Sequence, residues 1–190
     1  MTYLFRIYDA EAIWTLKLTL ARCPIVNWNF AYKNMTQTLL SLRLFGGFDL
    51  RLDDVPVDGF VSNKVRALLA FLAVTNRPQP RPVLAELLWG DKPDDVANAN
   101  LRMALSNLRK LIGPCLDITR GDVAVTKGCR FDVDVQHFQI QLGQVDLATL
   151  ESNCTLLEEA MALYCGDFLE VLPVRDASSF EEWALRQRER

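Results

Sequence analysis

The sequence has little of what catalytic and metal-binding sites require. It contains a single histidine, His137, and five cysteines, no two of which fall in a CxxC spacing, so it offers no set of zinc ligands. It also lacks a GxSxG motif and a glycine-rich phosphate loop. The paired carboxylates Glu158–Glu159 and Glu181–Glu182 are typical of solvated helix faces. We therefore expect no enzymatic activity, no metal and no cofactor.

Long apolar runs are also missing. No window reaches the roughly 18 to 20 uninterrupted apolar residues of a membrane span. Residues 13–20 are apolar, but Lys17 interrupts them, and Asp9 and Glu11 stand where a signal peptide has basic residues. We therefore expect a cytoplasmic protein that does not bind membranes.

The cysteines are scattered and odd in number, which favours reduced thiols in a cytoplasm. Cys115 and Cys129 flank a predicted hairpin, so a bridge between them is the weaker alternative.

The net charge of -3 over 190 residues conceals a strong asymmetry. Residues 1–34 carry 4 basic and 2 acidic side chains, residues 35–130 carry 13 and 10, and residues 131–190 carry 4 and 12. A mildly basic middle followed by an acidic end indicates two modules with different partners.

The first residues show no clear periodicity, and Met35 stands just before the first orderly strand pattern. We expect Met35 to be the natural start, so that the first 34 residues are an upstream extension. The N-terminal extension ahead of the first domain covers residues 1–38. The predicted domains are then residues 39–131 and residues 132–190.

The middle of the chain predicts strands, two short helices, a longer helix and a hairpin. Residues 41–57 alternate apolar and polar side chains around Gly46-Gly47, which is typical of a small antiparallel unit. A helix capped by Ser62 must end before Pro78, and a second has Pro82 in its first turn and Gly90 at its end.

The third helix is predicted over residues 93–112, with Asp91 as its cap and Pro93 in its first turn. One apolar stripe faces the core: Leu101, Ala104, Leu105, Leu108 and Ile112. Polar side chains project from the other side: Asn98, Arg102, Ser106, Asn107, Arg109 and Lys110. Two short strands joined at Arg120-Gly121-Asp122 follow, and residues 130–135 add a strand or lead into a helix capped by Asp134.

This order of elements is that of a winged helix. Such folds place the second helix of the helix-turn-helix in the major groove, and the hairpin reaches backbone or an adjacent groove. Arginine and asparagine can read base edges, and lysine and serine can hold phosphates. We expect Arg109 and Lys110 to contact the backbone and Arg102 and Asn98 to contact bases. A domain without a broad basic run makes few phosphate contacts, so tight binding needs a homodimer or a second site.

At these residues the chain resembles the SARP/AfsR-like family of bacterial transcriptional activators, which pair an OmpR-type winged helix with a bacterial transcriptional activator domain (BTAD). The resemblance runs from about residue 40 to residue 190 and rests on LRLFGGFDL, KVRALLAFLAV, LAELLWGDKPDDVANANLRMALSNLRKLIG, LYCGDFLE and FEEWALRQRER.

The resemblance implies that the third helix is the recognition helix and the hairpin its wing. Its DNA-facing residues would then be Arg102, Ser106, Asn107, Arg109 and Lys110, with Arg120 at the wing tip. It also implies duplex promoter DNA with direct repeats as a partner, and RNA polymerase as a further one.

Residues 134–190 predict an acidic, all-α segment. Leu156, Leu157, Ala160 and Leu163 recur on one face, and Phe180, Trp183 and Ala184 on another. The family resemblance implies tetratricopeptide-like repeats here, which usually need about three neighbours for stability. Because the chain stops at Arg190, either the regulator is truncated or the helices dock on the winged helix or on a partner. We expect Trp183 and the apolar face beside it to be partly exposed or to mediate self-association.

The fold class is therefore an α+β winged helix-turn-helix of the OmpR type, followed by a truncated all-α segment. The leading functional prediction is a sequence-specific DNA-binding transcriptional regulator that acts as an activator. The alternative is a protein-interaction module that no longer binds DNA alone, or that titrates a full-length relative.

Overall fold

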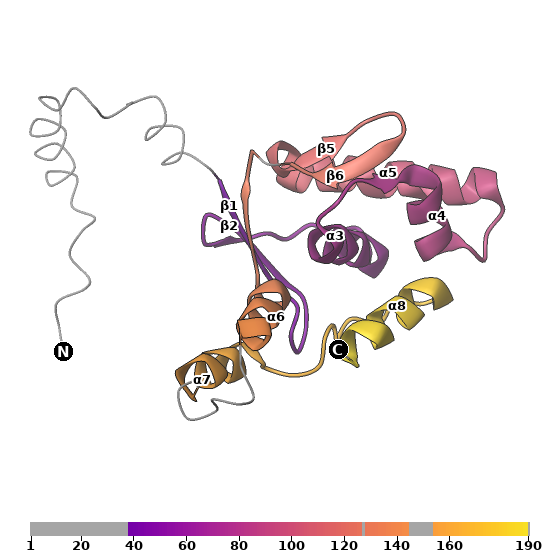
Figure 1. The fold of residues 1–190 in the computed structure, drawn as a ribbon. Helices are drawn as coiled ribbons and strands as arrows, with labels where there is room; N and C mark the ends of the chain where they lie inside the picture. Colours follow the sequence, from indigo (N-terminus) through magenta and orange to yellow (C-terminus); the bar gives the residue numbers. More distant parts are fainter. Residues whose placement is uncertain (1–37, 127, 145–153, 190) are drawn as a thin grey trace, which may run out of the picture. The chain divides into compact units, whose positions relative to one another are not determined.

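The computed structural model describes residues 38–126, 128–144 and 154–189, and the predicted extension and the start at Met35 lie outside them. Residues 38–190 form one compact unit. Its helices are α3 (Asn63–Thr75), α4 (Arg81–Trp89), α5 (Asp94–Ile112), α6 (Asp134–Gln144), α7 (Cys154–Leu163) and α8 (Ser178–Arg188), with a short 3-10 turn, η1, at Gly113–Cys115 (Figure 1). Among the described helices, none combines the length and the apolar character needed to cross a bilayer.

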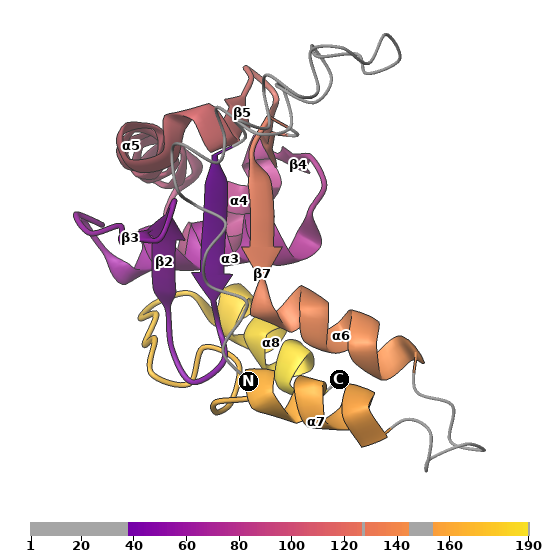
Figure 2. The ribbon, with the colours of Figure 1, turned by 90° about the vertical axis from the view of Figure 1, so that its left-hand side faces the viewer.

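The first sheet has the strand order β3-β2-β1-β7, as Figure 2 shows. Its strands are β1 (Leu39–Arg43), β2 (Asp49–Leu52), β3 (Val55–Pro56) and β7 (Arg130–Val133). The predicted antiparallel unit is confirmed for β1, β2 and β3, whereas β7 pairs with β1 in parallel. Leu40, Leu42 and Leu44 are fully buried because alternate residues of a strand share one face.

The second sheet is the small one that carries the hairpin. It joins β4 (Gln79–Pro80), β6 (Asp122–Val125) and β5 (Leu116–Ile118) in the order β4-β6-β5. The β5–β6 hairpin turns at Arg120-Gly121, as predicted. We call this hairpin the wing.

Helix α3 is the centre of the core. Every residue from Ala67 to Ala73 is buried, so the helix is covered on all sides and not along one stripe. It contacts α4, α5, β6 and β7. The predicted end before Pro78 is confirmed, since the helix ends at Thr75 and Asn76 adopts the left-handed conformation of a C-cap.

Asp134 joins the end of β7 to the end of β1. It begins α6, is 2% exposed, and its Oδ2 accepts hydrogen bonds from the main-chain N–H groups of Leu44 (2.8 Å) and Phe45 (3.1 Å). Burial raises the pKa of this carboxyl above its usual range, and the main-chain donors partly oppose that shift. Both alternatives for residues 130–135 are therefore realised, a strand followed directly by a helix.

The segment after α7 packs against the winged helix, which is one of the alternatives that the sequence left open. The main chains of Gly46 and Gly166 approach so closely that a Cβ on Gly46 would lie 2.9 Å from the carbonyl oxygen of Cys165. Both glycines have positive φ, so neither position suits another residue. The Leu169 N–H then donates to the Leu44 carbonyl oxygen at 2.8 Å.

Polar side chains of α3 also bind the segment after α7, nearer its C-terminal end. The Asn63 Nδ2 donates to the Pro173 carbonyl at 2.9 Å, and the Lys64 Nζ donates to the carbonyls of Leu88 (2.5 Å) and Asp176 (2.7 Å). Burial lowers the pKa of the Lys64 ammonium, although Asp91 and Asp176 oppose the shift.

Trp183 on α8 is half-buried in an aromatic cluster. Its ring centroid lies 4.9 Å from that of Phe71, 5.5 Å from that of Phe168 and 5.4 Å from that of Phe180. The partial exposure predicted for Trp183 is therefore confirmed. The exposure predicted for the apolar face beside it is wrong for Phe180 and Ala184, which are 2% and 6% exposed and pack in the core.

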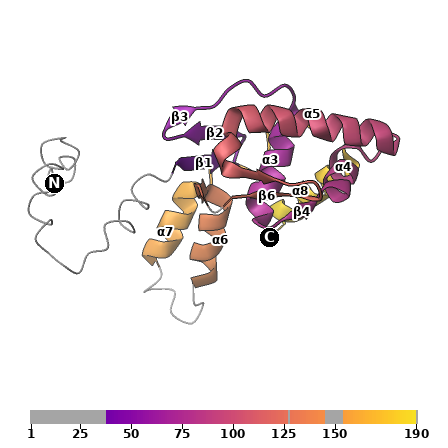
Figure 3. The ribbon, with the colours of Figure 1, turned by 90° about the horizontal axis from the view of Figure 1, so that it is seen from above.

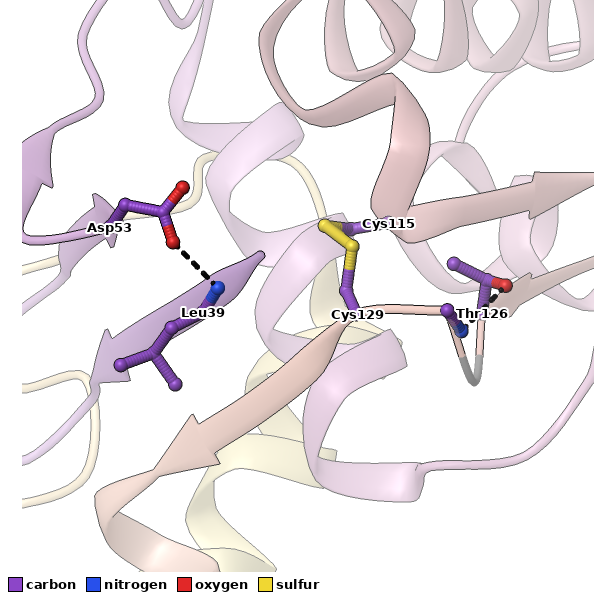
Figure 4. Close-up of a disulfide and its surroundings, with 6 residues drawn as sticks. Leu39, Asp53, Cys115, Thr126 and Cys129 are labelled. Carbon is purple, nitrogen blue, oxygen red and sulfur yellow. Dashed lines mark hydrogen bonds between the residues drawn. A yellow bond between two sulfur atoms is a disulfide. The ribbon is translucent and has the colours of Figure 1, made fainter. Parts of the chain in front are cut away.

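Cys115 and Cys129 form a disulfide, with their Cα atoms 5.2 Å apart (Figure 4). The expectation that the cysteines are reduced thiols is wrong for this pair, because β7 returns beside η1 and brings the two sulfurs together. The bridge closes the chain at the base of the wing, between the end of α5 and the start of β7. Cys165 is a free, exposed thiol.

We expect reduction of this disulfide to lower the free energy of unfolding by up to about 3 kcal/mol, the chain-entropy value for a loop of about 15 residues. The two cysteines are separated by 14 positions. Urea unfolding with and without dithiothreitol measures the difference. A Cys165→Ser chain should show the same difference, and an unchanged midpoint in reducing buffer would show that the bridge does not stabilise the fold.

Candidate nucleic-acid interface

Helix α5 begins one residue later than predicted, and its cap differs. Pro93, not Asp91, occupies the N-cap position, and the Pro93 carbonyl accepts the N–H of Ala97 at 2.9 Å. Asp91 instead forms an ion pair with Lys92 at 2.8 Å. Asp94 and Asp95 lie in the first turn, where the helix dipole favours negative charge.

The predicted division of α5 into two faces is confirmed. All five residues of the predicted apolar stripe are buried, together with Ala97. The opposite side is exposed at Asn98, Arg102, Ser106, Arg109 and Lys110. Figure 3 shows this helix running along one side of the unit, beside the wing.

Four arginines converge between α5 and the wing. They line a hollow of about 370 Å³, which we call the arginine hollow, with Arg102 and Arg109 from α5, Arg120 from the wing turn and Arg81 from the start of α4. Ser106 and Thr119 add hydroxyl groups to the same lining. Within the described part of the chain, none of these arginines lies within 4.0 Å of a carboxylate oxygen. The hollow therefore keeps its positive charge for an external anion.

Arg81 lines the arginine hollow, and the sequence did not single it out as a candidate. Its main-chain N–H donates to the Gly121 carbonyl at 2.9 Å, and its Nη1 donates to the Thr119 carbonyl at 3.3 Å. The sequence shows it only in the proline-rich connector, and the signal that would reveal it is the pairing of that connector with β6. Arg81 thus holds the turn that carries Arg120.

The wing turn is also fixed from within. The Thr119 Oγ1 accepts the N–H of Asp122 at 2.9 Å and that of Gly121 at 3.3 Å, and the Thr119 N–H donates to the Asp122 carbonyl at 2.9 Å. A turn with this many local bonds presents Arg120 from a defined backbone.

Asn98 and Lys110 lie on α5 but outside the hollow. The Asn98 Nδ2 donates to the Asp94 carbonyl at 2.7 Å, and the Asn98 carbonyl accepts the Nε of Arg102 at 3.2 Å, so Asn98 bonds within the helix. Lys110 is exposed near the helix C-terminus.

Asn107 lies on the opposite flank of α5 and bonds to the loop before α3. Its Oδ1 accepts the Val61 N–H at 3.2 Å and its Nδ2 donates to the Gly59 carbonyl at 3.1 Å. These contacts occupy both ends of the amide. The structure thus brings Arg102, Ser106, Arg109 and Arg120 together, and it places Asn107 away from them.

Among the described residues there is no group of three or more histidine, cysteine, aspartate or glutamate side chains that could hold a metal ion. The arginine hollow brings four cationic side chains together on this face. Its chemistry is that of anion binding by arginine, which matches phosphate oxygens and guanine edges.

The three helices α3, α4 and α5, followed by the β5–β6 wing and covered by a four-stranded sheet, define a winged-helix protein with a helical segment after it. The winged helix and the helical segment after it, both part of the predicted fold class, are therefore confirmed.

Comparison with known proteins is consistent with this class. No family model matches the chain. A stretch of 75 residues is 37% identical to the Transcriptional regulatory protein EmbR of Mycobacterium tuberculosis and to that of Mycobacterium bovis. The fold is similar to a solved structure, Mycobacterium tuberculosis EmbR in complex with a low affinity phosphopeptide, at a TM-score of 0.62 and 25% identity over 80% of this chain.

The chain spans only part of these proteins, covering 19% of the length of the curated relatives and 42% of the solved chain. Both similarities support assignment to a SARP-like family, as the sequence motifs indicated. The similar proteins are named as transcriptional regulators and not as enzymes.

Proposed function

We propose that this chain is a sequence-specific DNA-binding regulator of transcription, an activator, that works in the bacterial cytoplasm. Helix α5 enters the major groove, and the wing contacts the backbone or the minor groove near Arg120. The observation that carries the proposal is the arginine hollow, in which four guanidinium groups from α4, α5 and the wing, none of them in an ion pair with a described carboxylate, line one space.

The distribution of charge supports this orientation. Residues 131–190 carry 12 acidic and 4 basic side chains. All three ribbon views show α6 and α7 away from α5, at the other end of the unit. Glu158 and Glu159, the two acidic residues of α7, would therefore stay clear of phosphates while α5 and the wing approach them.

A single copy offers few phosphate contacts, so we propose that two copies bind neighbouring direct repeats of promoter DNA. With four arginines in contact, the affinity of one copy should fall about 100-fold between 50 and 200 mM salt, since the logarithm of the binding constant falls with a slope of about −0.9 for each neutralised phosphate.

The test uses the 190-residue chain and a fluorescent duplex selected by that chain from a random 20-base-pair pool. Fluorescence anisotropy over a series of salt concentrations gives the slope. Absence of binding to any duplex at low salt would contradict the proposal and would support the interaction module that the sequence left as the alternative.

A further inference from the structure

The exposed side of α5 carries apolar residues as well as arginines. Val96, Ala99 and Met103 are all exposed, with Met103 at 69% and Val96 at 40%. Their spacings of three and four positions align them along one side of the helix, opposite the buried stripe. We call these three residues the apolar ridge.

The apolar ridge lies on the outward crest of the helix. Ser106, three positions after Met103, lines the arginine hollow. Asn107, four positions after Met103, bonds to the loop at Val61. The ridge therefore runs between the hollow on one flank and that loop on the other. Its side chains add nothing to the core, because the core of α5 is on the other side.

The apolar ridge occupies the part of α5 that comes first in the chain. In a helix-turn-helix, the N-terminal residues of the recognition helix meet the base edges, and the arginines further along can reach the backbone. The single apolar group that base pairs display in the major groove is the 5-methyl group of thymine.

Resting on the DNA-binding function proposed above, we propose that the apolar ridge reads thymine 5-methyl groups, with Met103 as the residue that sets specificity. A flexible, polarisable side chain suits contact with a methyl group on the groove floor. The preferred DNA sites of this chain then contain thymine at the base pair that faces Met103, and cytosine there binds more weakly.

The experiment replaces thymine with deoxyuridine, which removes the methyl group and keeps the hydrogen-bonding pattern. The duplex selected by the wild-type chain is synthesised with one thymine replaced at a time, and each version is titrated by anisotropy. We expect about a fourfold loss of affinity at one or two positions, equivalent to about 0.8 kcal/mol for one methyl group.

The Met103→Ala chain should bind the thymine duplex more weakly than the wild type and show no difference between thymine and uracil at that position. Met103→Gln keeps the length of the side chain and should behave in the same way. The matched control is Met161→Ala on α7, where the methionine is 67% exposed, and this chain should keep the wild-type ratio.

Two results would overturn the inference while leaving DNA binding in place: a wild-type chain that binds but is insensitive to every uracil, and a Met103→Ala chain that keeps the wild-type uracil sensitivity. Failure to bind any selected duplex would instead overturn the proposed function itself.

Discussion

Replacing both Arg102 and Arg109 with alanine should weaken binding to the selected duplex at least about 30-fold, because each arginine that contacts a base or a phosphate contributes about 1–3 kcal/mol. The slope of affinity against salt should become shallower by about 0.9, since Arg109 is the one of the two that we expect to neutralise a phosphate. Both side chains are exposed and line the arginine hollow, so the fold should be retained.

The matched control for this experiment is Arg186→Ala on α8. The Arg186 Nε donates to the Glu182 carbonyl at 3.3 Å, the same intrahelical bond that Arg102 makes at 3.2 Å, and both side chains are exposed. The control should keep both the affinity and the slope. An unchanged slope in the Arg102→Ala/Arg109→Ala chain would mean that the DNA lies elsewhere.

The largest expected effect on stability is at Phe168. It is 2% exposed, and its ring packs edge-on against Trp183, with a centroid distance of 5.5 Å. Phe168→Ala should lower the free energy of unfolding by about 3–5 kcal/mol, the usual cost of truncating a buried phenylalanine. Urea unfolding followed by circular dichroism measures the change.

Val171→Ala provides the comparison, because Val171 belongs to the same segment and is 74% exposed. Its effect should stay within about 0.5 kcal/mol. If the Phe168→Ala chain lost only its C-terminal helix while the remainder unfolded at the wild-type midpoint, the segment after α7 would not share the core of the winged helix.

Local patterns in the sequence predicted most of the fold. The period of two at Leu40, Leu42 and Leu44 and the apolar stripe of α5 each follow from one short stretch of chain, and both appear in the structure. The cap of α5 was assigned to Asp91 because that residue type favours caps, but Lys92 takes its carboxylate. Because α5 begins at Asp94 with Pro93 at its N-cap, Asp91 also lies two positions too early to cap it.

The candidate site was predicted only where its residues share an element. Arg102, Ser106 and Arg109 lie on one helix, so their spacing sufficed. Arg81 joins them through the pairing of β4 with β6, which links residues about 40 positions apart, and Asn107 is diverted by a loop 46 positions earlier. The Cys115–Cys129 bridge depends in the same way on the return of β7 beside η1. Contacts between residues this far apart are set by the packing of the whole chain. They leave no periodic pattern in the local sequence from which they could be predicted.

Helix α4 is clamped at both of its ends. Its first residue, Arg81, is bonded to the wing turn, and the carbonyl of Leu88 in its last turn accepts Lys64, which also holds the main chain at Asp176. Helix α4 cannot shift along its own axis without breaking these hydrogen bonds. Helix α4 thus links the tip of the wing to the C-terminal segment through hydrogen bonds at its two ends.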